Sequence, residues 1–170
     1  MELPPLSPLH SHLSPLISLL LTKKTMQLDN FISKPDQGRV VAAIGEAEKM
    51  TSGEIRVHLT PKCGDDVMRD AIKAFNRLKM YKTRHRNGVL IFVAFESRKF
   101  AIIGDSGIDE VVSTNYWDEE KEILLTYLKN NDPATGLCAV IARVGAKLKA
   151  YFPSDDDDVN ELSNEISYEE

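Results

Sequence analysis

Apolar and polar residues form three strand-like stretches near the middle of the chain. Residues 54–60, EIRVHLT, alternate strictly, which predicts a strand with one buried face. Residues 89–95, VLIFVAF, are apolar throughout, which predicts a central strand covered on both faces. Residues 96–98 form a short turn into residues 99–104, KFAIIG, which we expect to pair antiparallel with the central strand.

Apolar residues recur at helical spacing on both sides of these strands. They predict helices over residues 33–47, 65–78, 115–129 and 133–151. The order helix, strand, helix, strand, strand, helix, helix predicts the α/β class. We expect a small mixed sheet of three to four strands, flanked by about four helices. The first two strands are joined through a helix, so they should be parallel.

Both ends of the chain lack these periods. Residues 1–27 hold four of the eight prolines and predict a disordered leader or an over-extended start, with Met26 as the expected natural beginning. A secretory signal would need a basic start and a longer apolar stretch. We expect one folded domain over residues 28–153, followed by an acidic flexible tail over residues 154–170.

The composition fits this organisation. A length of 170 residues, with 42% hydrophobic and 28% charged residues, suits one domain of ordinary size. The longest apolar run, the seven residues 89–95, is far shorter than the roughly 20 that a membrane-spanning helix needs, so no membrane association is expected. Cys63 and Cys138 lie far apart without a C-x-x-C spacing, which favours a reducing compartment. We therefore expect a cytoplasmic protein, and we take it to be a monomer, although nothing in the sequence determines the oligomeric state.

The net charge of −5 is unevenly distributed. Residues 153–170 hold eight Asp and Glu and no Lys or Arg, a local charge of −8. The other 152 residues hold 21 basic and 18 acidic residues, a net charge of +3. The folded body is thus slightly basic, and the acidity of the chain lies in its tail.

One rim of the predicted sheet collects carboxylates. Because the third strand turns back, its end at Gly104-Asp105 should lie beside the starts of the first two strands. Glu54, Asp105 and Asp109 would then meet there. Hard oxygen donors on a flexible loop favour calcium as the bound cation, with magnesium as the alternative. The other interpretation is that Asp105 and Asp109 only cap turns.

Several segments, in their order along the chain, resemble the TPM domain family. They are TSGEIRV at residues 51–57, RNGVLI at residues 86–91 and RKFAIIGDSGI at residues 98–108, with Trp117 beyond them. The resemblance covers about residues 30–153. The ending DDVNELSNEIS, residues 157–167, is similar to that of the short, single-domain, soluble bacterial members.

The resemblance implies a Rossmann-like α/β sandwich with an acidic, calcium-binding rim, and an acid phosphatase activity proposed for the family. Glu54, Asp105 and Asp109 match acidic positions near that rim. Longer members often have Asp-Asn-Gly before the central strand, whereas this chain has Arg86 in place of that Asp. A cation there would repel a metal ion or replace its charge, so we expect weaker metal binding.

Five basic residues fall within ten positions with no acid among them: Arg77, Lys79, Lys82, Arg84 and Arg86. One interpretation is a surface for an acidic protein partner or a phosphate group. Another is a solvated helix C-terminus, which the helix dipole favours. A third is a docking face for the chain's own acidic tail. No recognised nucleic-acid-binding fold surrounds the cluster, so nucleic acid is not the expected partner.

The chain has no P-loop, G-x-S-x-G, G-x-G-x-x-G or H-E-x-x-H motif, so whether it is an enzyme stays open. His58, on the polar face of the first strand, is interpreted as a surface histidine. The predicted function is a non-catalytic, calcium-binding interaction or regulatory domain. The alternatives are a weak metal-assisted phosphatase, suggested only by the resemblance, and a basic-patch binder of an acidic partner.

Overall fold

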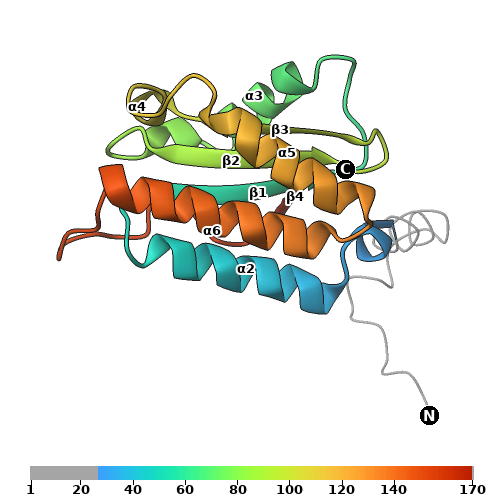
Figure 1. Cartoon of the computed structure of the whole chain (residues 1–170), viewed down its shortest axis with the longest axis horizontal. Helices are drawn as coiled ribbons and strands as arrows, with labels where there is room; N and C mark the ends of the chain where they lie inside the picture. Colours follow the sequence, from blue (N-terminus) through green and yellow to red (C-terminus); the bar gives the residue numbers. More distant parts are fainter. Residues whose placement is uncertain (1–26, 170) are drawn as a thin grey trace, which may run out of the picture.

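A four-stranded mixed sheet forms the centre of the computed structural model, which describes residues 27–169 (Figure 1). Residues 27–31 are helical. The later elements are α2 Lys34–Glu48, β1 Glu54–Thr60, α3 Val67–Arg77, η2 Met80–Lys82, β2 Gly88–Ala94, β3 Lys99–Gly104, α4 Ser106–Asp109, α5 Tyr116–Lys129, α6 Pro133–Tyr151 and β4 Ser167–Tyr168. The predicted α/β class is confirmed. The leader predicted for residues 1–27 lies, apart from Gln27, outside the described residues.

The strands lie in the order β3-β2-β1-β4. β1 and β2 are parallel, with Glu54 opposite Gly88, and β3 runs antiparallel to β2. Every residue of β2 is buried, which agrees with its prediction as an interior strand. β4, which the sequence pattern does not reveal, adds two residues parallel to β1 at its outer edge.

The helices α2, α5 and α6 cover one face of the sheet. α2 and α6 run side by side, and α5 packs against α6 (Figure 1). The alternating apolar residues of β1, Ile55, Val57 and Leu59, belong to this core and are fully buried. The apolar stripe of α6 lies in the same core. Because β1 turns its apolar face to this layer, its polar residues all point to the other face.

Two parts of the chain pack against the other face of the sheet. Over β2 and β3 it is covered by α3, whose residues Ala71 and Phe75 share a core with Leu90 and Phe92. Over β1 it is covered by residues 154–169, which we call the C-terminal segment. The backbone N–H groups of Glu161 and Leu162 donate to the Glu54 carboxylate at 2.7 and 3.3 Å, and Ser167 and Tyr168 then form β4.

The C-terminal segment thus differs from the flexible tail that its composition predicts. It binds the body mainly through backbone hydrogen bonds, which the number of acidic side chains in the sequence does not predict. Its few larger apolar residues are also used, because Leu162 packs against the α3 core, and Ile166 and Tyr168 pack against the core on the opposite face. The segment is therefore part of the domain as the structure describes it.

Side-chain caps begin three of the longer helices. Ser33, Asp66 and Asp132 accept hydrogen bonds from the first turns of α2, α3 and α6. The helix predicted from residue 65 accordingly begins at Val67, with Asp66 as its cap. Among residues 27–169, none of the helices combines the length and the apolar character needed to cross a membrane.

Candidate functional site

Asp105, the first of the predicted metal ligands, is held by Arg86. The guanidinium donates from Nε to Oδ2 at 2.7 Å and from Nη2 to Oδ1 at 2.8 Å. Asp105 is also the N-cap of the short helix α4, because its Oδ1 accepts the Ser106 N–H at 2.8 Å. The carboxylate is buried, whereas about half of the Arg86 side chain is exposed. Both oxygens of Asp105 are therefore engaged by groups of the chain itself.

The backbone around this ion pair is tightly packed. Arg86 has a positive φ of 51°, and its carbonyl accepts the Gly107 N–H at 2.9 Å. A Cβ atom on Gly107 would lie 2.3 Å from the His85 carbonyl oxygen, so only glycine fits there. Arg86 thus holds α4 against the loop before β2.

The other two predicted ligands lie apart from this pair. Glu54 is buried on the face of the sheet that α3 and the C-terminal segment cover. There its carboxylate accepts hydrogen bonds from two backbone N–H groups of the C-terminal segment. Asp109 is exposed, and its Oδ1 accepts a hydrogen bond from Trp117 Nε1 at 3.5 Å. Within residues 27–169, no three His, Cys, Asp or Glu side chains are grouped as a ready metal site. The structure therefore does not bring Glu54, Asp105 and Asp109 together.

The chain itself engages part of the predicted basic cluster, namely the side chains of Arg77 and Arg86 and the backbone of Arg84. Arg77 forms an ion pair with Glu169. The backbone N–H of Arg84 donates to both carboxylate oxygens of Glu161, at 3.1 and 3.2 Å. Arg86 is bound to Asp105, whereas Lys79 and Lys82 are exposed. These contacts agree with the interpretation of the cluster as a docking face for the acidic end of the chain. Its use by another partner stays a prediction.

His58 lies under the C-terminal segment and is not a surface residue. Its side chain is 2% exposed and stacks on Phe92 with the ring centroids 5.5 Å apart. Nδ1 lies 2.8 Å from Ser167 Oγ, and Nε2 lies 3.6 Å from the Glu169 carboxylate. Burial and the nearby Arg77 charge lower the pKa of His58 to about 4. The imidazole is consequently neutral at physiological pH.

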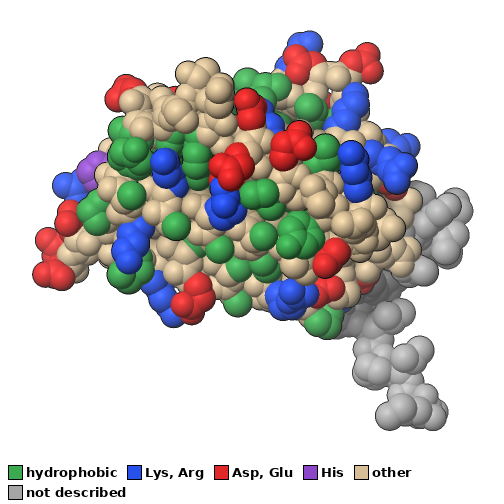
Figure 2. All heavy atoms as spheres, in the orientation of Figure 1, with side chains coloured by type: hydrophobic (Ala, Val, Ile, Leu, Met, Phe, Trp, Pro, Cys, Tyr) green, Lys and Arg blue, Asp and Glu red, His purple; other side chains and the backbone are tan. Residues whose placement is uncertain are grey.

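A different set of carboxylates lines a pocket where β1 begins. Glu48 and Glu54 come from the end of α2 and the start of β1, and Asp155 and Asp158 come from the C-terminal segment. We call these four residues the acidic pocket, which has a volume of about 250 Å³. Figure 2 shows acidic side chains at the end of the molecule where the chain leaves α6 (Figure 1).

The two glutamates of the acidic pocket are perturbed by their surroundings. Glu48 Oε1 accepts the Ile55 N–H at 2.7 Å, but Oε2 is buried and accepts no hydrogen bond of normal geometry, with Asn164 as a polar neighbour. Burial raises the pKa of Glu48 and of Glu54 to about 7. The carboxylates nearby add to both shifts, with Asp158 among those that act on Glu54. Both groups are therefore only partly ionised near neutral pH unless a cation is near.

A sequence profile decides the family. The profile of the TPM domain matches residues 26–147, which is more than half of the chain. The chain belongs to the TPM domain family. The family resemblance predicted from the segments around Glu54, Asn87 and Asp105 is thereby confirmed.

Solved structures include proteins that are similar to this TPM domain. The BA42 protein from the psychrophilic bacterium Bizionia argentinensis is 43% identical, with a TM-score of 0.75; the match covers 79% of this chain and 93% of that one. The N-terminal domain of the cg2496 protein from Corynebacterium glutamicum is 19% identical, with a TM-score of 0.57, covering 75% of this chain and 80% of that one. At that identity the second likeness shows the fold alone. A search of the curated proteins finds no match.

Sequence reasoning missed three of the four residues of the acidic pocket. Asp155 and Asp158 belong to an acidic run that composition assigns to solvent, and they lie beyond the residues that the TPM profile matches. Glu48 is the last residue of α2, and the residues next to it in the sequence do not indicate a binding site. Only the run of four Asp, placed directly after the last helix, marks in the sequence that a charged segment lies near the domain.

The raised pKa of Glu54 predicts how stability changes with pH in buffers free of divalent cations. The folded-state value is about 7, against an ordinary value of 4.5. The contribution of Glu54 to stability is therefore fully present below about pH 4.5 and is lost as the pH rises through 7. We expect the Glu54→Gln variant to gain stability relative to the native chain between pH 5 and pH 8, by up to about 3 kcal/mol, since one pKa unit is worth about 1.4 kcal/mol.

Urea unfolding of both chains at pH 5, 6.5 and 8 measures this difference. His58 acts in the opposite direction, because its stabilising contribution is present above about pH 6.5 and is lost as the pH falls through about 4. Both chains contain His58, so its effect cancels in the comparison. A stability difference that stays constant with pH would contradict the prediction.

Proposed function

We propose that this TPM domain is a non-catalytic, calcium-binding domain whose cation sits in the acidic pocket and fastens the C-terminal segment to the sheet. The observation that supports this proposal is the Glu48 carboxylate. One of its oxygens is held by the Ile55 N–H, and the other is buried without a hydrogen bond of normal geometry. A bound cation would give this oxygen a partner that also neutralises its charge.

The donors of the pocket suit calcium. Besides the four carboxylates, the lining includes the hydroxyl groups of Thr51 and Ser154 and the amide of Asn160. Calcium accepts six to eight oxygen ligands in irregular geometry, whereas magnesium demands a near-ideal octahedron and gives up its water reluctantly. Magnesium is therefore the weaker alternative. Because no three acidic groups are already grouped as a metal site within residues 27–169, binding requires Asp155 and Asp158 to move toward the glutamates.

Such a cation would join two parts of the chain. Glu48 and Glu54 belong to the body, and Asp155 and Asp158 to the C-terminal segment. Calcium would offset the repulsion among these four acids and favour the docked position of the segment. The surface over β1 would then respond to calcium concentration, which is the basis of a regulatory or interaction role.

A binding role accounts for the lining better than a catalytic one. The residues around the acidic pocket are oxygen donors and Lys49, and no histidine or cysteine is among them. His58, the histidine of β1, is buried under the C-terminal segment. General-base catalysis would require it within reach of a substrate.

Calcium titration of the full chain, followed by amide chemical shifts, tests the proposal. We expect the shifts to change around residues 48–54 and 154–161, with protons released near pH 6.5 because the two glutamates must ionise. Saturation at a hundredfold excess over Kd should stabilise the fold by about 2.7 kcal/mol. Glu48→Gln should weaken binding about tenfold or more.

Asp109→Asn is the matched control. It also removes one carboxylate, but Asp109 is exposed and lies outside the acidic pocket. Its calcium affinity should equal that of the native chain. If calcium shifts only the amides near Asp105 and Asp109, or if Glu48→Gln binds as the native chain does, the proposal fails.

A further inference from the structure

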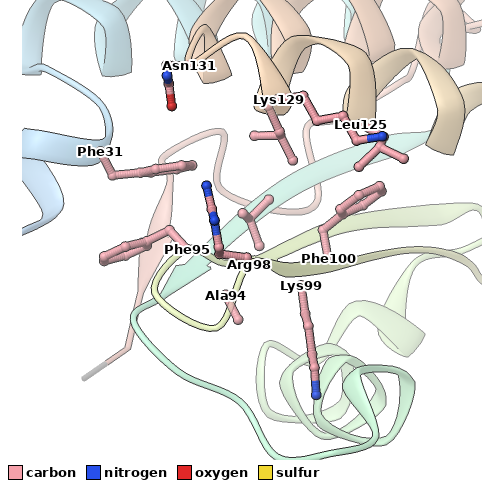
Figure 3. A pocket seen from close by; sticks show the side chains of 11 residues that line it. Phe31, Ala94, Phe95, Arg98, Lys99, Phe100, Leu125, Lys129 and Asn131 are labelled. Atoms are coloured by element: carbon pink, nitrogen blue, oxygen red, sulfur yellow. The ribbon is translucent and has the colours of Figure 1, made fainter.

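A second pocket lies at the opposite end of the sheet from the acidic pocket, and Figure 3 shows the side chains that line it. It has a volume of about 450 Å³ and opens where β2 ends and β3 begins. In open α/β sheets, ligands bind beyond the carboxyl ends of the parallel strands. The pocket has that position, and its volume falls within the range of about 300–1,000 Å³ that small-molecule sites occupy.

The walls of this pocket are mainly aromatic and aliphatic. They are formed by Phe31, Phe95, Phe100, Leu125 and Leu128, and we call the cavity the aromatic pocket. Phe31 and Phe95 stack with their centroids 4.9 Å apart and their planes 13° apart, which makes one rigid wall. All five side chains are only partly buried, so they retain apolar surface for a guest.

The rim of the aromatic pocket is cationic. Arg98, Lys99 and Lys129 line it, and no acidic residue does. Lys99 donates to the carbonyls of Gly64 and Asp65 at 3.2 and 3.1 Å, so its ammonium is already engaged. Arg98 and Lys129 form no ion pair with any acid among residues 27–169. In a chain with a net charge of −5, an acid-free cationic rim favours an anionic guest.

Arg98 is placed to meet such a guest. It lies in the turn between β2 and β3 with a positive φ of 55°. Figure 3 shows its side chain reaching from that turn toward Phe31, at the aromatic wall. A guanidinium presents a planar fork that matches a carboxylate. An apolar group against the phenyl rings would thus have its acid end beside Arg98.

We propose that the aromatic pocket binds a small apolar carboxylate, an aryl or short-chain acyl acid, whose carboxylate pairs with Arg98 and Lys129. The apolar walls bury the hydrocarbon part, and the two free cations select the anion over its neutral analogue. This binding is independent of the calcium site, because the two pockets share no residue. Either proposal can fail without the other.

The test uses 2-naphthoate as the probe and 2-naphthamide as its neutral counterpart of nearly the same shape. Titrated into the full chain and followed by amide chemical shifts, 2-naphthoate should move signals of residues 95–100 and 125–131. We expect 2-naphthamide to bind at least tenfold more weakly. Acetate, which has the charge without the apolar part, should produce no shifts at the same concentrations.

Two variants assign the charge selection to named residues. Arg98→Asn removes the guanidinium and suits a positive φ, and Lys129→Gln removes the ammonium. Each should weaken 2-naphthoate several-fold while leaving 2-naphthamide unchanged. Lys82→Gln, which removes an exposed lysine outside the pocket, is the control and should bind both probes as the native chain does. Equal affinities for the two probes, shifts confined to other regions, or no binding would each overturn the proposal.

Discussion

Ending the chain after Ser154 is expected to lower the free energy of unfolding by about 2–4 kcal/mol, a destabilisation typical of losing several buried contacts. The truncation removes β4 and both N–H donors of Glu54. It also exposes His58 and the apolar surface that Leu162 covers. The melting temperature should fall by roughly 4–16 °C, at about 2–4 °C per kcal/mol.

The loss is partly offset because the shorter chain has fewer residues to order. Hydrogen exchange gives a second measurement, since the β1 amides should exchange faster once the strand becomes an edge. Asp157→Asn is the control, because it removes one exposed acid of the C-terminal segment and leaves the segment in place. A truncated chain that melts with the native one would restore the interpretation of residues 154–170 as a flexible tail.

Replacing Arg86 by Asp is expected to give the second large effect. The substitution removes both hydrogen bonds to the buried Asp105 carboxylate and places a like charge beside it. A buried carboxylate that loses its partner destabilises the fold, and the new charge adds repulsion. We expect the melting temperature to fall by roughly 2–12 °C, as a loss of about one to three kcal/mol would produce.

The positive φ of residue 86 is not the cause of this expected destabilisation, since Asp tolerates that conformation better than Arg does. Arg86→Asp combined with Asp105→Asn should recover part of the loss, because it removes the repulsion. Thermal unfolding of the single and double variants measures both effects. An Arg86→Asp chain that is as stable as the native one, and binds calcium more tightly, would support the sequence-based view that Arg86 only displaces a metal.

The sequence predicts the sheet better than it predicts the partners of its polar residues. The apolar run of β2 and the alternation of β1 each identify a strand, because burial on two faces or on one leaves a distinct period. Topology then places Glu54 and Gly88 side by side, as the register shows. The end of β3 lies there too, with Gly104 opposite Val89.

The contacts of the polar residues at this end of the sheet depend on side-chain direction, which spacing does not give. Asp105 caps α4 and binds Arg86, whereas Glu54 points to the second face and binds backbone of the C-terminal segment. β4 was beyond prediction for a related reason. Two residues that pair by backbone carry no period, and an acidic segment without Lys or Arg reads as solvated.

The position of β4 has a consequence for how copies of this chain meet. Among residues 27–169, the two-residue strand β4 is the only strand that pairs with the outer edge of β1, and no helix or strand lies between Tyr151 and Ser167. The same edge on a second copy offers identical partners for Ser167 and Tyr168. Two chains that exchange these ends would form a domain-swapped dimer that keeps every native strand pairing. Because such a dimer needs no new contacts, the fraction of chains in it would depend on the protein concentration.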